Sequence, residues 1–189
     1  MNILVTGGAG FLGSILVRML LDKGHCVTVL DNLMYRQDSL LTCCNHRDFK
    51  FWRGDVRDTN LVQILAKDCD VIIWLAAIVG APACDGNPEA WAINFEAVQN
   101  LLPRLGEGQQ LLYPCSNSGY GVGGEGHCTE DSPMNPITLY GESKVSAEQV
   151  VLGRKNSISL RFATLMGVSP RMRLDLLVND FCFRAMRDK

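Results

Sequence analysis

Short apolar runs alternate along most of the chain with longer stretches in which apolar residues recur at helical spacing. The short runs predict buried strands, and the periodic stretches between them predict the helices that connect those strands. We predict strands at residues 3–6, 26–30, 49–53, 69–75, 110–115 and 157–165. We predict helices at residues 11–23, 58–67, 89–102, 138–152 and 174–186.

Residues at the ends of these helices support their boundaries. Gly24 follows the first helix as a C-terminal capping glycine does, and Asp58 can cap the second. Asn87 followed by Pro88 is typical of a helix N-terminus. The segment at 117–136 is rich in glycine and proline, and a loop of that length in a compact domain usually has a function.

The regular alternation of strands and helices predicts an α/β fold with a Rossmann-type doubly wound parallel sheet and helices on both faces. A length of 189 residues suits one domain, or one domain with a fragment of a second. We predict a first domain at residues 1–167 and the start of a truncated second lobe at residues 168–189. Most of that lobe would then be absent.

Composition narrows the classes of protein. Hydrophobic residues make up 47% of the chain and the net charge is −2, which argues against a broad nucleic-acid or membrane surface. The chain enters its first strand without a basic leader and has no run of transmembrane length, so we expect a cytoplasmic protein. Among eight cysteines there is no CxxC pair, and Cys43, Cys44 and His46 match no zinc template. We therefore expect free thiols and no metal site.

The turn between the first predicted strand and helix contains Gly7, Gly10 and Gly13 in the spacing GxxGxxG. Such glycines permit a tight turn, a close approach of backbone to a pyrophosphate, and close packing of helix on strand. Phe11 and Leu12 open the helix, whose free N–H groups would face the phosphates. This motif in this position predicts a dinucleotide site.

Asp31 ends the second predicted strand and indicates which dinucleotide binds. An acidic residue there accepts hydrogen bonds from the adenosine ribose and repels a 2′-phosphate, which favours NAD over NADP. We assign the adjacent Asn32 to the same site. Arg36 lies nearby in the sequence, so this preference is strong without being absolute.

Tyr140 and Lys144 lie one turn apart on a predicted helix and therefore share a face. A nearby ammonium favours the phenolate, so Lys144 could bring Tyr140 toward the pKa of a useful base. Ser116 ends the fifth predicted strand, at the sheet edge where ligands of parallel sheets bind. Its hydroxyl could orient the substrate oxygen that Tyr140 deprotonates.

With these motifs the chain resembles the extended short-chain dehydrogenases/reductases, and among them the NAD-dependent epimerase/dehydratase family that acts on nucleotide sugars. The resemblance extends from Met1 to the last residue and includes the segments 54–58, 75–77, 115–121 and 161–167. It implies that Asp55 and Val56 hold the adenine. It also implies cofactor-site roles for Leu75, Ala76, Ala77 and Asn94.

Two positions that bear on the reaction depart from the family pattern. Family dehydratases carry an Asp-Glu pair directly after the catalytic Ser or Thr, whereas this chain has Asn117 and Ser118. Decarboxylases carry Glu, and 3,5-epimerases Cys, where Ser118 stands. Loss of these groups leaves 4-epimerisation or simple oxidation and reduction, in which Tyr140 and NAD do the chemistry.

The resemblance implies an NAD-dependent nucleotide-sugar epimerase or oxidoreductase with a UDP-, GDP- or dTDP-linked substrate. The alternative is a non-catalytic NAD-binding module without a complete substrate site. Family members often dimerise through the helices that correspond to residues 88–102 and 138–152, so we expect a homodimer. Apolar residues near the end of the chain would either remain uncovered or pack back on the sheet; they are Leu176, Leu177, Phe181 and Phe183.

Overall fold

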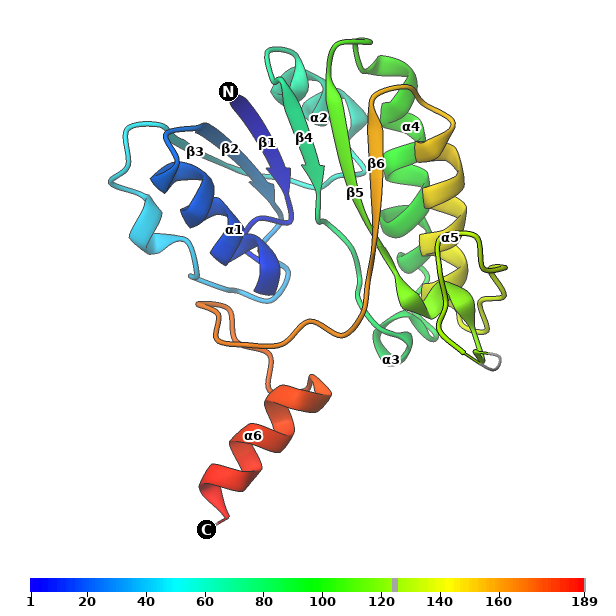
Figure 1. The fold of residues 1–189 in the computed structure, drawn as a ribbon. Helices are drawn as coiled ribbons and strands as arrows, with labels where there is room; N and C mark the ends of the chain where they lie inside the picture. Colours follow the sequence, from blue (N-terminus) through cyan, green and yellow to red (C-terminus); the bar gives the residue numbers. More distant parts are fainter. Residues whose placement is uncertain (124–125, 189) are drawn as a thin grey trace.

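The computed structural model describes residues 1–123 and 126–188, in which six strands form one parallel sheet in the order β3-β2-β1-β4-β5-β6 (Figure 1). The strands are β1 Asn2–Thr6, β2 Cys26–Asp31, β3 Phe49–Arg53, β4 Val71–Trp74, β5 Gln110–Ser116 and β6 Ser157–Phe162. The helices are α1 Phe11–Asp22, α2 Thr59–Ala66, α3 Ala81–Cys84, α4 Ala97–Leu101, α5 Leu139–Leu152 and α6 Leu177–Arg187. This strand order is that of a Rossmann fold and confirms the predicted fold class.

The two faces of the sheet bury different sets of side chains because successive residues of a strand point to opposite faces. On one face, strands β1, β2 and β4 pack against α1; the buried residues there include Ile3, Val5, Val27, Val29, Ile73, Val17 and Leu21. On the other face the strands pack against α2, α4 and α5; the buried residues there include Leu4, Leu30, Ile72, Leu111, Val62, Val98 and Val151. The core thus holds the carboxyl ends of the strands in fixed register.

Local signals set several helix ends, two of them at the predicted residues Asp58 and Gly24. Asp58 accepts a hydrogen bond from the backbone N–H of Leu61 (3.0 Å), and Thr138 caps α5 by accepting from Gly141 N–H (3.1 Å). Gly24 adopts a left-handed φ of 77° two residues after the end of α1. Cys26 lies exposed at the start of β2.

The largest differences from the sequence predictions lie in two places. The helix expected at 89–102 contains a π-helical turn at Ala92–Glu96 before α4. β6 ends at Phe162, three residues before the expected position, because residues 163–165 leave the sheet to line a cavity. No helix within residues 1–123 and 126–188 has the length and hydropathy needed to cross a bilayer.

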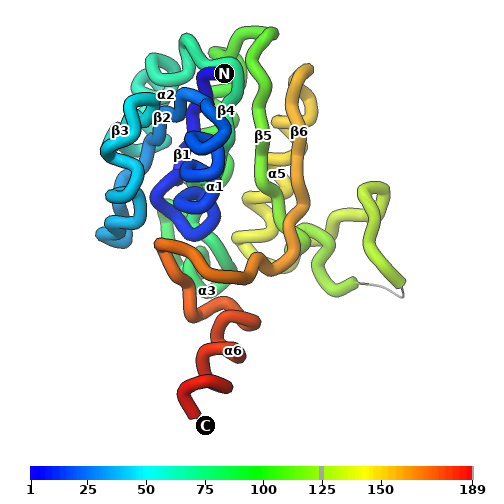
Figure 2. Tube along the Cα trace, turned by 60° about the vertical axis from the view of Figure 1, so that its left-hand side comes forward, coloured from blue at the N-terminus to red at the C-terminus, as the bar shows by residue number. Residues whose placement is uncertain are grey.

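The C-terminal helix α6 projects away from the sheet in both views (Figures 1 and 2). Leu177, Phe181 and Phe183 are exposed, whereas Leu176 is partly buried and lines the cavity described below. The interpretation in which this helix packs back on its own sheet is therefore wrong.

Candidate active site

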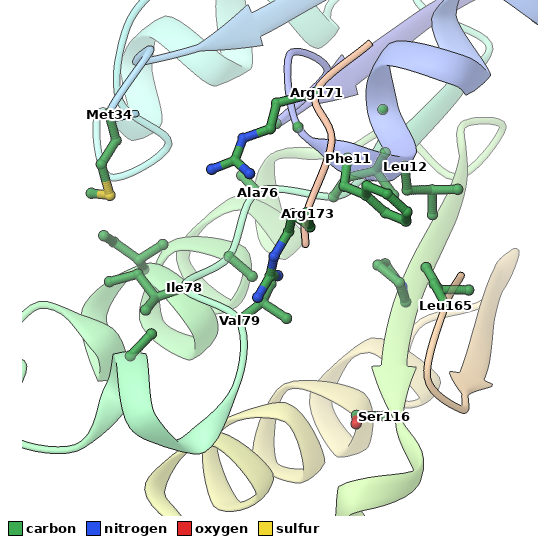
Figure 3. Close-up of a pocket in the computed structure, with 18 of the residues that line it drawn as sticks. Phe11, Leu12, Met34, Ala76, Ile78, Val79, Ser116, Leu165, Arg171 and Arg173 are labelled. Carbon is green, nitrogen blue, oxygen red and sulfur yellow. The ribbon is translucent and has the colours of Figure 1, made fainter. Parts of the chain in front are cut away.

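A cavity of about 540 Å3 opens at the carboxyl ends of the strands (Figure 3). It is lined by all but one of the residues that the sequence assigned to a site. Those lining it are Gly7, Gly10, Phe11, Leu12, Gly13, Asp31, Asn32, Asp55, Val56, Leu75, Ala76, Ala77, Ser116, Tyr140 and Lys144. The sheet edge therefore brings the glycine turn and the Ser-Tyr-Lys set into one space.

The glycine turn leaves no room for side chains. Gly7 has a φ of 69°, and a Cβ there would lie 2.7 Å from the backbone nitrogen of Ala76. A Cβ on Gly13 would lie 2.6 Å from the carbonyl oxygen of Gly7. No side chain caps α1 at Gly10, so the first turn of the helix faces the cavity with its backbone. This cradle fits the pyrophosphate of a dinucleotide.

The buried carboxylate of Asp31 is fixed at the cavity wall. It accepts hydrogen bonds from the backbone N–H groups of Ala9 (3.0 Å) and Leu33 (2.8 Å), and from the side-chain amide of Gln37 (3.3 Å). Burial raises the pKa of Asp31, while the two backbone bonds oppose that rise. Arg36, which the sequence placed near Asp31, is not part of the cavity lining.

Asp55 and Val56 follow β3, the strand paired with β2, and line the same cavity as Asp31. Both carboxylate oxygens of Asp55 accept hydrogen bonds from the Arg57 guanidinium, at 2.9 and 2.8 Å. The hydrogen bond from Arg57 lowers the pKa of Asp55, so this carboxylate stays ionised at neutral pH. Val56 is buried and gives the wall an apolar surface.

Asn94 is the exception among the expected site residues, because it does not line the cavity. Its amide accepts a hydrogen bond from Ile78 N–H (2.8 Å), and donates to the carbonyl oxygen of Ile78 (2.9 Å) and to the hydroxyl of Ser143 (3.3 Å). Both polar ends of the side chain are thus engaged. Asn94 therefore fixes the backbone of Ile78, which lines the cavity, and its expected role at the cofactor site stays a prediction.

Ser116, Tyr140 and Lys144 come from the end of β5 and the first turns of α5. The hydroxyl of Ser116 donates to the hydroxyl of Ser118 (3.0 Å) and accepts from Ser118 N–H (3.1 Å). Asn117 and Ser118, the positions where dehydratases carry acidic residues, also line the cavity. The set therefore provides one candidate base, one cation and hydroxyl donors.

The electrostatics of Tyr140 differ from the sequence expectation. Burial raises the pKa of Tyr140, and the hydrogen bond with Ser116 is the main effect that lowers it. The ammonium of Lys144 lies 4.1 Å from the centroid of the Tyr113 ring, a cation–π contact in the protein interior. The expected activation of Tyr140 by Lys144 is therefore not the dominant effect in this arrangement.

Lys144 leads to a prediction on pH and stability. Burial lowers its pKa from the usual 10.5 to about 8. Between these values the unfolded chain holds a proton that the folded chain has released, so the free energy of unfolding rises with pH. From pH 8 to pH 10 we expect the free energy of unfolding of the unchanged protein to rise by about 2 kcal/mol relative to that of Lys144→Met. Urea unfolding at each pH measures it, and a difference that stays constant would contradict the buried cation.

The cavity also has a wall that the sequence interpretation assigned to another lobe. This wall comes from residues beyond β6 and includes Arg171, Arg173, Asp175 and Leu176. The predicted domain boundary at residue 167 assigned these residues to the second lobe and not to the cofactor site. The alternating arginines after Ser169-Pro170 were the available signal.

Comparisons with known proteins agree with this geometry. The model of the NAD dependent epimerase/dehydratase family matches residues 3–178. The low-salt glycan biosynthesis protein Agl12 of Haloferax volcanii is 34% identical, over 98% of this chain and 63% of that protein. The UDP-glucose 4-epimerase of Lactobacillus helveticus is 31% identical, over 87% of this chain and 50% of that protein.

A solved structure shows the same architecture. The UDP-glucuronic acid 4-epimerase from Bacillus cereus, in complex with NAD, superposes with a TM-score of 0.85 and 27% identity. The match covers 100% of this chain and 65% of that chain. The chain thus spans between half and two thirds of the length of these three proteins. The family match, the strand order and the glycine cradle together show that this chain belongs to the NAD-dependent epimerase/dehydratase family.

Proposed function

We propose that this chain binds NAD in the cavity and forms the catalytic half of a nucleotide-sugar 4-epimerase or oxidoreductase. The observation that carries the proposal is the convergence of Ser116, Tyr140 and Lys144 on the cavity formed by the glycine cradle and Asp31. The relatives named above include UDP-sugar 4-epimerases, one of them solved with NAD. NAD, when bound, supplies a hydride acceptor.

The residues of the chain would divide the remaining work. The glycine turn receives the pyrophosphate at the start of α1, and Asp31 accepts hydrogen bonds from the ribose hydroxyls. Tyr140 removes the proton from a sugar hydroxyl that Ser116 orients. Lys144, buried beside Tyr113, would bond the second ribose. Asn117 and Ser118 offer no carboxylate, which disfavours dehydration.

A second candidate is an NAD-binding module that does not turn over a sugar. This candidate is kept because the chain matches only 63% of one relative's length and 50% of the other's. Both candidates share the cofactor site and differ in whether a sugar nucleotide binds. The cytoplasmic location and a homodimer formed through α4 and α5 remain predictions.

Thermal unfolding with ligands tests the proposal. NAD at one hundred times its dissociation constant should raise the free energy of unfolding by about 2.7 kcal/mol, and NADP should raise it less because Asp31 repels a 2′-phosphate. A panel of UDP-, GDP- and dTDP-sugars follows in the presence of NAD. A further rise with one nucleotide class supports the enzyme, a rise with NAD alone supports the module, and no rise with NAD refutes both.

A further inference from the structure

Residues 163–176, here called the strap, run from the end of β6 along the carboxyl ends of the strands to the side of α1 (Figures 1 and 2). The strap lies over the cavity, and seven of its residues line it. These are Ala163, Thr164, Leu165, Arg171, Arg173, Asp175 and Leu176. A segment beyond the last strand therefore forms one wall of the candidate cofactor site.

A buried serine fastens the strap to the glycine turn. The hydroxyl of Ser169 donates to the carbonyl oxygen of Phe11 (2.7 Å) and lies 3.0 Å from the hydroxyl of Ser14. It also accepts from the backbone N–H of Arg171 (3.2 Å). Ser169 and Ser14 are 6% and 2% exposed, so these bonds are shielded from water. Arg171 is thereby held next to the first turn of α1.

A buried asparagine fixes the shape of the strap. Asn179, on α6, accepts a hydrogen bond from Gly167 N–H (2.9 Å) and donates to the carbonyl oxygen of Arg173 (2.9 Å). These two bonds join residues on either side of Arg171. These hydrogen bonds fix the conformation of the strap, so the side chains that line the cavity have defined positions.

The charges along the cavity leave Arg171 without a carboxylate partner among residues 1–123 and 126–188. Asp55 pairs with Arg57, and Asp175 pairs with Arg173. The guanidinium of Arg171 donates only to the carbonyl oxygen of Met172 (3.3 Å) and lies 4.9 Å from the centroid of the Tyr35 ring. Arg171 lowers the pKa of Asp175 only through its charge, without a hydrogen bond between the two side chains. Figure 3 shows Arg171 and Arg173 reaching into the cavity.

We propose that Arg171, on the strap, binds the pyrophosphate of NAD together with the α1 N-terminus; this inference rests on the cofactor assignment of the proposed function. The glycine turn offers backbone N–H groups but no cationic side chain, while a pyrophosphate carries two negative charges. A planar guanidinium can bond two phosphate oxygens at once. Ser169, tied to Phe11, sets the distance between the strap and the turn.

Calorimetric titration of the whole chain with NAD, ADP-ribose, ADP and adenosine tests this inference without any turnover. Arg171→Gln removes the charge and keeps a polar side chain of similar reach. We expect it to weaken NAD, ADP-ribose and ADP about tenfold, which is about 1.4 kcal/mol, and to leave adenosine unchanged. Arg184→Gln, which removes an exposed guanidinium on α6, is the matched control and should bind all four ligands normally.

The ligand series separates the possible failures. Equal NAD affinity in Arg171→Gln and the unchanged protein overturns the phosphate contact. An equal loss for adenosine and NAD also overturns it, because Arg171 would then act through its stacking on Tyr35. If the unchanged protein binds none of the four ligands, the proposed function fails and this inference fails with it. Circular dichroism and melting of each variant establish that it is folded.

Discussion

Replacement of Tyr140 by phenylalanine is expected to reduce the rate of hydride transfer by a factor of about 100 to 10,000. The substitution removes only the phenolic oxygen, so the sugar hydroxyl loses the group that takes its proton. The ring remains packed at the start of α5, and within residues 1–123 and 126–188 Ser116 is the one partner named for the lost oxygen. Turnover of the sugar nucleotide selected by the melting panel measures the effect.

NAD binding by the same variant is the control for this prediction. The glycine cradle and Asp31 are untouched, so the dissociation constant for NAD should change by less than about a factor of three. The corresponding change in binding free energy is well under the 1.4 kcal/mol of a tenfold effect. A variant that loses turnover and keeps NAD places Tyr140 in the chemical step. Turnover at the normal rate in Tyr140→Phe would remove this residue from the mechanism.

The second large effect is expected at Glu148, a 3% exposed carboxylate on α5. It accepts hydrogen bonds from the Nε of Arg161 on β6 (3.0 Å) and from the hydroxyl of Ser159 (2.6 Å). The Arg161 side chain is largely buried, and Glu148→Ala removes the carboxylate that balances its charge. We expect the free energy of unfolding to fall by about 3 to 5 kcal/mol. Urea unfolding followed by circular dichroism measures it.

Two further variants make this prediction specific. Glu142→Ala removes an exposed carboxylate from the same helix and should change stability by less than about 0.5 kcal/mol. Arg161→Met combined with Glu148→Ala should recover part of the loss, because the uncompensated charge is then gone. If Glu148→Ala is as stable as Glu142→Ala, the ion pair contributes nothing to the fold.

The alternation of strands and helices could be predicted because each element buries a face whose period is visible in the sequence. The ends of strands and helices were harder to predict where the same residues could either extend the element or line the cavity. Residues 163–165 follow β6 directly and include two apolar residues, yet their backbone leaves the sheet to line the cavity. The four-residue helix α3 is too short to give a periodic signal.

The candidate site was predictable wherever a motif fixes the backbone. Gly7 and Gly13 stand where the structure has no space for a Cβ, and Asp31 ends β2 as expected. The role of Asn94 was not predictable, because its partner, the backbone of Ile78, has no sequence signature. The contact of Lys144 with Tyr113 was also hidden, because it joins two residues from different elements.

The strap also bears on the timing of cofactor exchange. Strap residues line the cavity and Ser169 is bonded to Phe11, so a dinucleotide would have a wider path into the cavity if that contact opened. If exchange used that path, entry would be limited by the opening motion and not by collision, and departure would be slowed in the same way. An epimerisation returns its hydride to the sugar from which it came and leaves the cofactor in its starting state. A slowly exchanging NAD is therefore no handicap to such an enzyme, since one bound molecule can serve many cycles.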